Sequence, residues 1–188
     1  MKQEELLRQW IEDSLATKRK FFSENTDKIL ALCDALRDVK KEGKKALIFG
    51  NGGSAADAQH FAAELMHRVE KKVIGLRAFA LHTDTSVITA IGNDEGFNRI
   101  YARQIQVLAE PGDLAIAITT SGNSTNILEA LQAARERKCL TAGLLGRTGG
   151  KALDLCNIAL VVDNQSTPRI QETHGMIIHL VCQLLENT

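Results

Sequence analysis

The residues best suited to chemistry include two short polar runs, each expected where a buried strand leads into a helix. The first run, Gly50–Ser54, reads Gly-Asn-Gly-Gly-Ser and follows an apolar segment. Its glycines let backbone N–H groups approach a ligand closely, and a helix start adds unpaired N–H groups and partial positive charge that favour an anion. Ser54 and Asp57 have the spacing of a capping box, which predicts a helix start here. The run matches neither the Rossmann nor the P-loop spacing, and a plain strand-to-helix turn is the alternative.

The second run, residues 119–124, reads Thr-Thr-Ser-Gly-Asn-Ser and precedes another expected helix. Its hydroxyl groups, together with backbone N–H groups, can hold a phosphate dianion without a cation. A cluster of helix N-caps is the simpler alternative, but a single cap needs only one such residue. We therefore favour phosphate binding at this loop.

Paired imidazole and carboxylate groups form a third candidate. His60 and Glu64 stand four residues apart on an expected helix, so both lie on one face. They could bind one divalent metal, or Glu64 could act as a base. An ordinary surface contact between the two side chains is the alternative interpretation.

The expected last helix carries another stripe of candidates. Gln171, Gly175 and His179 follow one another at steps of four residues. A glycine inside a helix costs about 1 kcal/mol relative to alanine, so we expect a ligand or another subunit to approach closely there. His174 lies off this stripe and is interpreted as structural or exposed.

Asn93 and Asp94 are the last candidates from the residues alone. The carboxylate of Asp94 could accept hydrogen bonds from sugar hydroxyl groups. Helix capping explains the pair equally well at this stage.

The elements that must position these groups follow a βαβ pattern. Continuous apolar runs predict parallel strands covered on both faces, at residues 46–49, 77–81, 114–119, 140–145 and 158–162. Helices are expected between and after them, at residues 55–69, 85–91, 96–107, 126–137, 150–155 and 168–186. This alternation predicts an α/β fold with a doubly wound, mainly parallel five-stranded sheet flanked by helices. Ligands bind such sheets at the carboxyl ends of the strands, where the polar runs lie.

Residues 4–42 form an expected helical extension with a break at residues 23–26. Long amphipathic helices before an α/β unit often pack against another subunit. We therefore expect one domain over residues 1–188, with residues 1–42 used in oligomerisation and residues 43–188 forming the α/β core.

Composition excludes several classes of function. The 188 residues include 23 Lys plus Arg and 23 Asp plus Glu, so the formal net charge is zero, which argues against nucleic acid bound through phosphate neutralisation. The sequence has neither an apolar run long enough to cross a membrane nor an N-terminal signal core. None of the four cysteines forms a C-x-x-C pair, which indicates buried thiols in a reducing cytoplasm.

Together the motifs resemble the sugar isomerase (SIS) family, and most closely its phosphoheptose isomerase branch. The matching residues are Gly50–Leu65, Ile91–Asp94, Thr119–Ser124 and Arg169–Glu172. The resemblance covers nearly the whole chain, and its first motif is long and specific. It implies an aldose–ketose isomerase that converts D-sedoheptulose 7-phosphate to D-glycero-D-manno-heptose 7-phosphate through an enediol. The product of that family feeds bacterial heptose synthesis for lipopolysaccharide core and other cell-surface glycans.

The resemblance also implies roles for the substrate-binding residues. The sugar would be lined by Asn51, Gly52 and Gly53, with Asn93 and Asp94 on its hydroxyl groups. The phosphate would be held by Ser54, Thr119, Ser121 and Ser124, with Thr120 nearby. The loop begins with Thr119 where the family usually has serine, and Val69 stands where the family often has tyrosine.

A metal centre and an acid/base pair are implied as well. One zinc ion per subunit would be bound by His60, Glu64, Gln171 and His179. Glu64 and His179 would exchange the protons, and both Glu64 and Gln171 would contact substrate. The family is homotetrameric, with active sites at subunit interfaces, so a sugar phosphate and further copies of the chain are the expected partners.

Two alternatives remain at this stage. One is a non-catalytic SIS-domain protein that binds the replication initiator DnaA. That paralogue departs more from the glycine turn and the hydroxyl loop, both of which this chain has. The other is an SIS isomerase or sensor for a different sugar phosphate, such as a hexose phosphate. A panel of ketose and aldose phosphates would separate these possibilities.

Overall fold

Five predicted strand segments form one parallel sheet in the computed structural model, which describes residues 2–187. The prediction that all are covered on both faces is wrong for the edge strand at residues 77–80, where exposed and buried residues alternate. The strands are β1 (Lys45–Gly50), β2 (Arg77–Ala80), β3 (Leu114–Thr119), β4 (Leu140–Gly146) and β5 (Ile158–Val162). Their order is β2-β1-β3-β4-β5, and every neighbouring pair is parallel. The order reverses beside β1, which is the position where an open α/β sheet binds its ligands.

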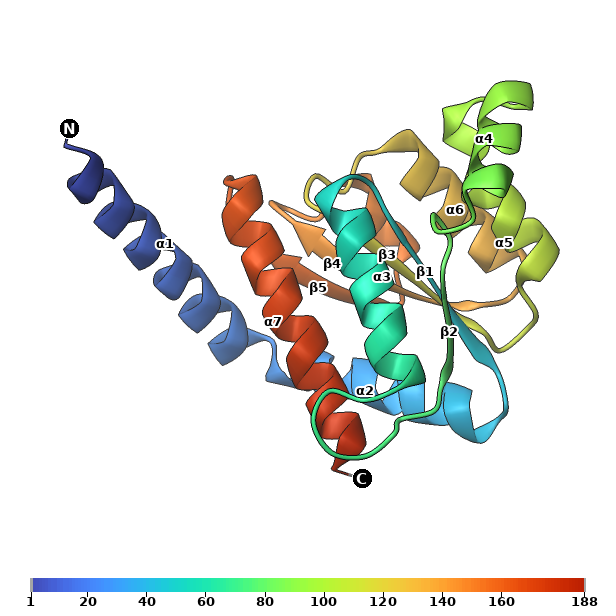
Figure 1. Ribbon diagram of the computed structural model, residues 1–188, viewed down its shortest axis with the longest axis horizontal. Coiled ribbons are helices and arrows are strands. Elements are labelled where there is room, and N and C mark those ends of the chain that lie inside the picture. Colours follow the sequence, from blue (N-terminus) through green and yellow to red (C-terminus); the bar gives the residue numbers. More distant parts are fainter. Residues whose placement is uncertain (1, 188) are drawn as a thin grey trace.

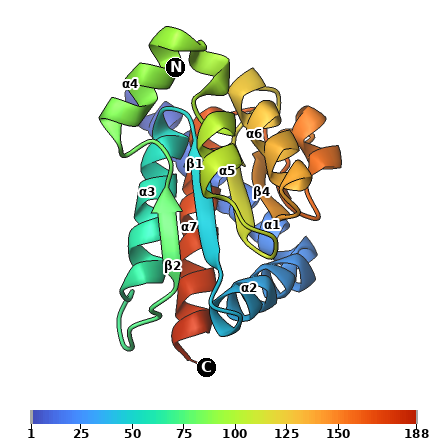
Figure 2. The ribbon, with the colours of Figure 1, turned by 90° about the vertical axis from the view of Figure 1, so that its right-hand side faces the viewer.

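Helices cover both faces of this sheet (Figures 1 and 2). The α-helices are α1 (Gln3–Glu24), α2 (Thr26–Lys41), α3 (Gly53–Met66), α4 (Thr85–Asp94), α5 (Ala102–Leu108), α6 (Thr125–Glu136) and α7 (Thr167–Glu186). Two 3-10 segments are η1 (Phe97–Arg99) and η2 (Gly150–Leu155). Alternate residues of β3 point to opposite faces, so Ile116 packs in a core with α2, α3 and α7, whereas Ala117 packs in a core with α5 and α6.

The predicted fold class is confirmed, and the strand boundaries agree within one residue at each end. Two predicted helices differ in kind from the structure, and two differ in their ends: α3 ends three residues earlier than the helix predicted at 55–69, and α4 ends three residues later than the helix predicted at 85–91. The helix expected at 96–107 is divided into η1 and α5, and Tyr101 between them turns its hydroxyl inward to donate to the carbonyl of Gly50 at 2.5 Å. The helix expected at 150–155 is a 3-10 segment, because Gly149 and Gly150 enter it with φ of +86° and +54°.

The N-terminal turns of the first helix extend away from the rest of the chain (Figure 1). Within α1, which the structure describes in full, only Thr17 and Phe21 are buried. Leu7, Trp10, Ile11 and Leu15 are apolar and 44–55% exposed. The predicted break before α2 is confirmed at Asn25, whose side chain donates to the carbonyl of Phe21.

All four cysteines are unpaired thiols, as the sequence predicts, and Cys156 is the least buried of them. Burial raises the pKa of Cys33 to about 11 and that of Cys156 to about 12.

Within residues 2–187, no helix combines the length and apolar character that crossing a bilayer requires.

His174 is fully buried on the sheet side of α7, which confirms a structural role. Its Nε2 lies 3.1 Å from the carbonyl oxygen of Leu145 on β4. Burial lowers the pKa of His174 from 6.5 to about 4, although the bond to Leu145 opposes this shift. The imidazole is therefore neutral in the folded chain near pH 7.

This burial predicts a pH dependence of stability. Between pH 6.5 and about 4 the unfolded chain binds a proton at His174 and the folded chain does not. Stability should therefore fall as the pH falls through this window, by up to about 1.4 kcal/mol per pH unit from this group. His174→Gln should flatten the slope measured by urea unfolding at pH 7, 6 and 5. The exposed His67→Gln is the matched control, and equal slopes in His174→Gln and the wild type would contradict the prediction.

Candidate functional site

The turn after β1 is shaped by glycines that have no room for a side chain. A Cβ at Gly50 would lie 2.5 Å from the carbonyl oxygen of Ser54 and 2.8 Å from that of Ile118. Gly52 has φ of +57° and is the N-cap of α3, a conformation that glycine adopts without strain. The turn therefore brings backbone close to the carboxyl end of β3.

The predicted capping box at this turn is wrong. The helix begins at Gly53, so Ser54 already lies inside the first turn, where its side chain is buried. Asp57 does not cap the helix either, and its Oδ2 is buried without a hydrogen-bond partner among the described residues. The positive φ of Gly52 starts the helix without a side-chain cap, which the capping pattern could not reveal.

Three hydrogen bonds hold the turn, and none of them was predicted. Tyr101 donates to the carbonyl of Gly50, and burial raises the pKa of its phenol to about 12. The amides of Asn51 and Asn126 form a reciprocal pair, with both N···O distances at 2.9 Å. Because Asn126 lies in the first turn of α6, this pair joins the two candidate phosphate-binding segments.

The loop Thr119–Ser124 is equally tightly packed. Gly122 has φ of +65°, and a Cβ there would overlap the carbonyl oxygen of Gly149. Asn123 fixes the loop further, since its Oδ1 accepts from the backbone of Lys151 at 3.1 Å and its Nδ2 donates to the carbonyl of Ser121 at 2.9 Å. Ser124 is the N-cap of α6, yet its hydroxyl makes no capping hydrogen bond. That hydroxyl is therefore available to a ligand.

A cavity of about 180 Å³ lies between the two glycine-containing turns. It is lined by Asn51, Ser54, Ile118, Thr119, Thr120, Ser121, Ser124, Thr167 and Gln171. Among these described residues none is charged, so an anion in the cavity would be held by hydroxyl, amide and backbone donors. All but two of the lining residues were predicted from the sequence as substrate-binding residues. Of the exceptions, Thr167 stands four residues before Gln171, and this spacing could have identified it.

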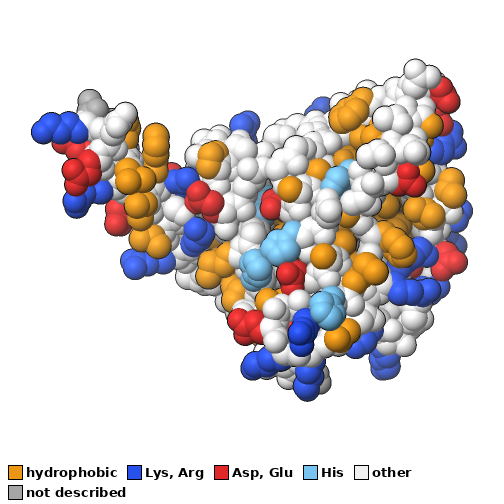
Figure 3. Space-filling model, in the orientation of Figure 1, with side chains coloured by type: hydrophobic (Ala, Val, Ile, Leu, Met, Phe, Trp, Pro, Cys, Tyr) orange, Lys and Arg blue, Asp and Glu red, His pale blue; other side chains and the backbone are white. Residues whose placement is uncertain are grey.

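The imidazole and carboxylate candidates gather further along α3 and α7, outside the cavity lining. The Nε2 of His60 lies 3.2 Å from Oε1 of Glu64, and the rings of His60 and His179 meet edge to face with centroids 4.8 Å apart. The Oε2 of Glu64 is buried and has no hydrogen-bond partner within the described chain. Figure 3 shows histidine and acidic side chains together on this face of the molecule. The structure thus brings His60 against both Glu64 and His179, while their roles at a shared site with Gln171 stay a prediction.

Gln171 occupies the seam between α7 and the start of α3. A Cβ at Gly53 would lie 2.5 Å from the amide nitrogen of Gln171, so this glycine allows the close approach. Gly53 precedes His60 by seven residues, or about 10 Å along the helix. Gln171 therefore stands about two turns nearer the cavity than the imidazole pair.

The donor set suits a zinc ion in its chemistry. Two imidazoles and a carboxylate with one free oxygen are N and O donors of the kind that zinc accepts, and the amide oxygen of Gln171 is the weakest donor of the set. Within the described residues, no three His, Cys, Asp or Glu side chains already stand in a metal-binding arrangement. His60 directs Nε2 to Glu64 instead, so metal binding would require these side chains to turn.

Asp57 adds a half-buried carboxyl to the same stripe of α3. Burial raises the pKa of Asp57, and the nearby His60 partly opposes that shift. Besides the His-Glu-His cluster, four predicted residues lie outside the cavity lining: Gly52, Gly53, Asn93 and Asp94. The last two are exposed at the end of α4, where the amide of Asn93 donates to the carboxylate of Asp94 at 2.7 Å. Beyond the backbone of its own helix, a Cβ at Gly175 would meet no atom of the described chain within 4 Å, so no close contact within one chain explains this glycine.

The sequence is similar to a known domain family and to phosphoheptose isomerases from other bacteria. The family model described as SIS domain matches residues 9–146. Phosphoheptose isomerase from Trichlorobacter lovleyi is 51% identical over 176 residues, which cover 94% of this chain and 90% of the relative. Phosphoheptose isomerase from Geobacter sulfurreducens is 54% identical over 159 residues, which cover 85% of this chain and 84% of the relative.

Solved structures show the same likeness. The chain superimposes on phosphoheptose isomerase GmhA from Neisseria gonorrhoeae with a TM-score of 0.94 and 37% identity, covering 100% of both chains. A phosphoheptose isomerase from Francisella tularensis gives a TM-score of 0.93 and 32% identity with the same coverage. The sugar isomerase domain of an RpiR transcription factor from Sphaerobacter thermophilus, at 16% identity and a TM-score of 0.70, covering 96% of this chain and 89% of that chain, shows the fold alone.

The packing at Gly122 predicts a large effect of a single methyl group. Gly122→Ala should destabilise the chain by about 2–4 kcal/mol, because the new Cβ meets backbone at a positive φ. Gly92→Ala is the control, since its Cβ would meet only Ile100 at an ordinary 3.8 Å, and it should change stability by about 1 kcal/mol or less. Urea unfolding measures both effects. Equal stability of the two variants would contradict the packing argument.

Proposed function

The chain belongs to the SIS domain family and matches its phosphoheptose isomerases along most of its length, and from this premise we propose that it converts D-sedoheptulose 7-phosphate to D-glycero-D-manno-heptose 7-phosphate in bacterial heptose biosynthesis. The observation that carries the proposal is an uncharged, hydroxyl-lined cavity at the carboxyl ends of β1 and β3, together with a His-Glu-His cluster about two turns further along α3 and α7. The cavity suits the phosphate, and the cluster suits proton transfer.

The phosphate group is bound by side-chain hydroxyls and helix N-termini. Ser54, Thr119, Ser121 and Ser124 supply the hydroxyl donors, with Thr120 beside them. The first turns of α3 and α6 add unpaired N–H groups and partial positive charge. This binding lies remote from the reacting carbons and helps to orient them.

The sugar chain extends from the cavity toward the seam between α3 and α7. The turn Asn51–Gly53 and Gln171 line its path, and Asn93 and Asp94 are the proposed contacts to more distant hydroxyl groups. Asn51 is held by Asn126 before the substrate arrives. The amide that faces the sugar is therefore already oriented.

The reaction moves a proton between C1 and C2 through an enediol. The unpaired Oε2 of Glu64 can accept the proton from carbon, and His179 can exchange a proton with the substrate oxygens. His60 stands between the two, in contact with both, and so orients them. The two catalytic groups come from different helices, which explains why both α3 and α7 are needed.

A zinc ion completes the proposed site. It would be held by His60, Glu64, Gln171 and His179, whose donor atoms match its preferences. When bound, the metal would act as a Lewis acid that stabilises negative charge on the enediolate oxygens.

We further propose a homotetramer in the cytoplasm. An apolar groove of about 680 Å³ runs between α1, α2 and α7 and includes Leu15, Phe22 and Leu180. Together with the exposed apolar residues of α1, this groove supports packing against further copies of the chain. The four unpaired thiols support a reducing compartment.

Removing the proposed base tests the mechanism. Glu64→Gln should lower kcat for sedoheptulose 7-phosphate by about a hundredfold or more, because an amide cannot accept the proton. The affinity for inorganic phosphate should stay within about twofold, since the phosphate donors are untouched. Kinetics and calorimetry give the two values. Glu136→Gln, at an exposed position on α6, controls for loss of charge, and a near-normal kcat in Glu64→Gln would remove this residue from the mechanism.

Metal removal tests the zinc proposal separately. Dialysis against a chelator should abolish isomerase activity, and added Zn²⁺ should restore it, because the enediolate would lose its Lewis acid. Elemental analysis of the purified protein should find about one zinc per chain. Full activity in a chelated, zinc-free sample would contradict the proposed metal.

A further inference from the structure

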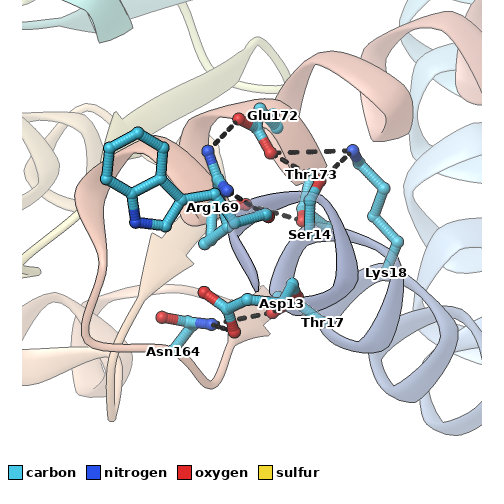
Figure 4. Close-up of polar contacts among 9 residues, drawn as sticks. Asp13, Ser14, Thr17, Lys18, Asn164, Arg169, Glu172 and Thr173 are labelled. Carbon is cyan, nitrogen blue, oxygen red and sulfur yellow. Dashed lines mark hydrogen bonds and ion pairs between the residues drawn. The ribbon is translucent and has the colours of Figure 1, made fainter. Parts of the chain in front are cut away.

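Two residues that flank Gln171 face away from the cavity and bind α1 instead. Arg169 donates from Nη1 to the carbonyl of Trp10, and from Nη2 to Oε1 of Glu172 at 2.6 Å. Glu172 in turn accepts from the hydroxyl of Ser14 at 2.6 Å, and its Oε2 lies 3.7 Å from Nζ of Lys18. Figure 4 shows these contacts between the first turns of α7 and the middle of α1. We call this set of contacts the α1 clasp.

A further contact joins the same two elements just before α7. Oδ1 of Asn164 accepts from the backbone N–H of Ser166, the N-cap of α7, at 2.7 Å. Its Nδ2 donates to the hydroxyl of Thr17 at 2.7 Å and to Asp13 at 3.3 Å (Figure 4). The start of α7 is thus tied to successive turns of α1.

Helix geometry places the clasp opposite the cavity. Thr167 and Gln171 are four residues apart and line the cavity together. Arg169 and Glu172 fall on the other side of the same two turns, because each residue rotates the helix by about 100°. The first turns of α7 are therefore held between α1 and the cavity.

The clasp stabilises the start of α7, where the N-cap residue contributes little. The N-cap Ser166 makes no side-chain capping hydrogen bond. The side chain of Arg169 is only 14% exposed, whereas that of Glu172 is 37% exposed, so the charge-assisted hydrogen bonds between them are partly shielded from water. Within α1, burial is confined to Thr17 and Phe21, so polar contacts account for much of its attachment.

We propose that Arg169 and Glu172 are positioning residues, which hold Thr167 and Gln171 at the sugar-phosphate cavity by clasping α1 to α7. The inference rests on the proposed function only for its kinetic readout. The structural part, that α1 sets the affinity of the cavity for an anion, stands on the contacts alone. Neither Arg169 nor Glu172 lines the cavity.

The test compares Arg169→Ala, Arg169→Lys and Glu172→Gln with Asp163→Asn. Asp163 pairs with Lys20 of α1 at 2.7 Å, but both side chains are more than half exposed and the pair includes no residue of α7, so this variant is a matched control. Titration with inorganic phosphate, followed by the amide NMR signals of Gly122 and Ser124, reports cavity affinity without turnover. Kinetics with sedoheptulose 7-phosphate then separate KM from kcat.

Arg169→Ala and Glu172→Gln should weaken phosphate binding and raise KM by about tenfold each, because each leaves a charged partner incompletely paired. Arg169→Lys should recover part of the loss, and kcat should change less than KM. Asp163→Asn should match the wild type. If the wild type fails to isomerise the sugar but Arg169→Ala still weakens phosphate binding, the proposed function falls and the positioning role stands.

Two results would overturn the inference. One is wild-type phosphate affinity in both Arg169→Ala and Glu172→Gln. The other is an equal loss in Asp163→Asn, which would show that any weakened attachment of α1 has the same effect. Should Arg169→Ala fail to fold, Arg169→Lys and Glu172→Gln decide the question by the same titration.

Discussion

The site depends on close packing of backbone at two turns that exclude a Cβ atom. At Gly50 the turn after β1 presses against β3, and at Gly122 the loop after β3 presses against the segment that follows β4. These contacts leave an uncharged cavity between two helix N-termini. A dianion can be bound there by dipoles and hydroxyls alone, because the donors are fixed before it arrives.

The last helix connects the parts of this site. Its first turns contribute Thr167 and Gln171 to the cavity, its middle places His179 against His60, and its buried His174 fixes it to β4. The opposite side of the same helix start binds α1 through Arg169 and Glu172. Phosphate binding, proton transfer and the N-terminal extension therefore share one structural element.

Much of this arrangement could be predicted from the sequence. Continuous apolar strands predicted the parallel sheet, and the carboxyl-end rule brought Ser54 and Ser124 to one cavity. Other features depend on contacts between distant residues, which local patterns do not encode. The amide pair of Asn51 and Asn126 is 75 residues apart in sequence, and the capping box failed because a positive φ at Gly52 started the helix earlier.

The central claim is that the cavity holds the phosphate of a sugar whose first two carbons react beside Glu64 and His179. Proton NMR of the purified protein with sedoheptulose 7-phosphate, and in parallel with sedoheptulose lacking the phosphate, tests it most directly. The account predicts that an aldose heptose 7-phosphate accumulates in the first sample and that the second stays unchanged. No aldose in the first sample, or equal conversion of both sugars, would contradict it.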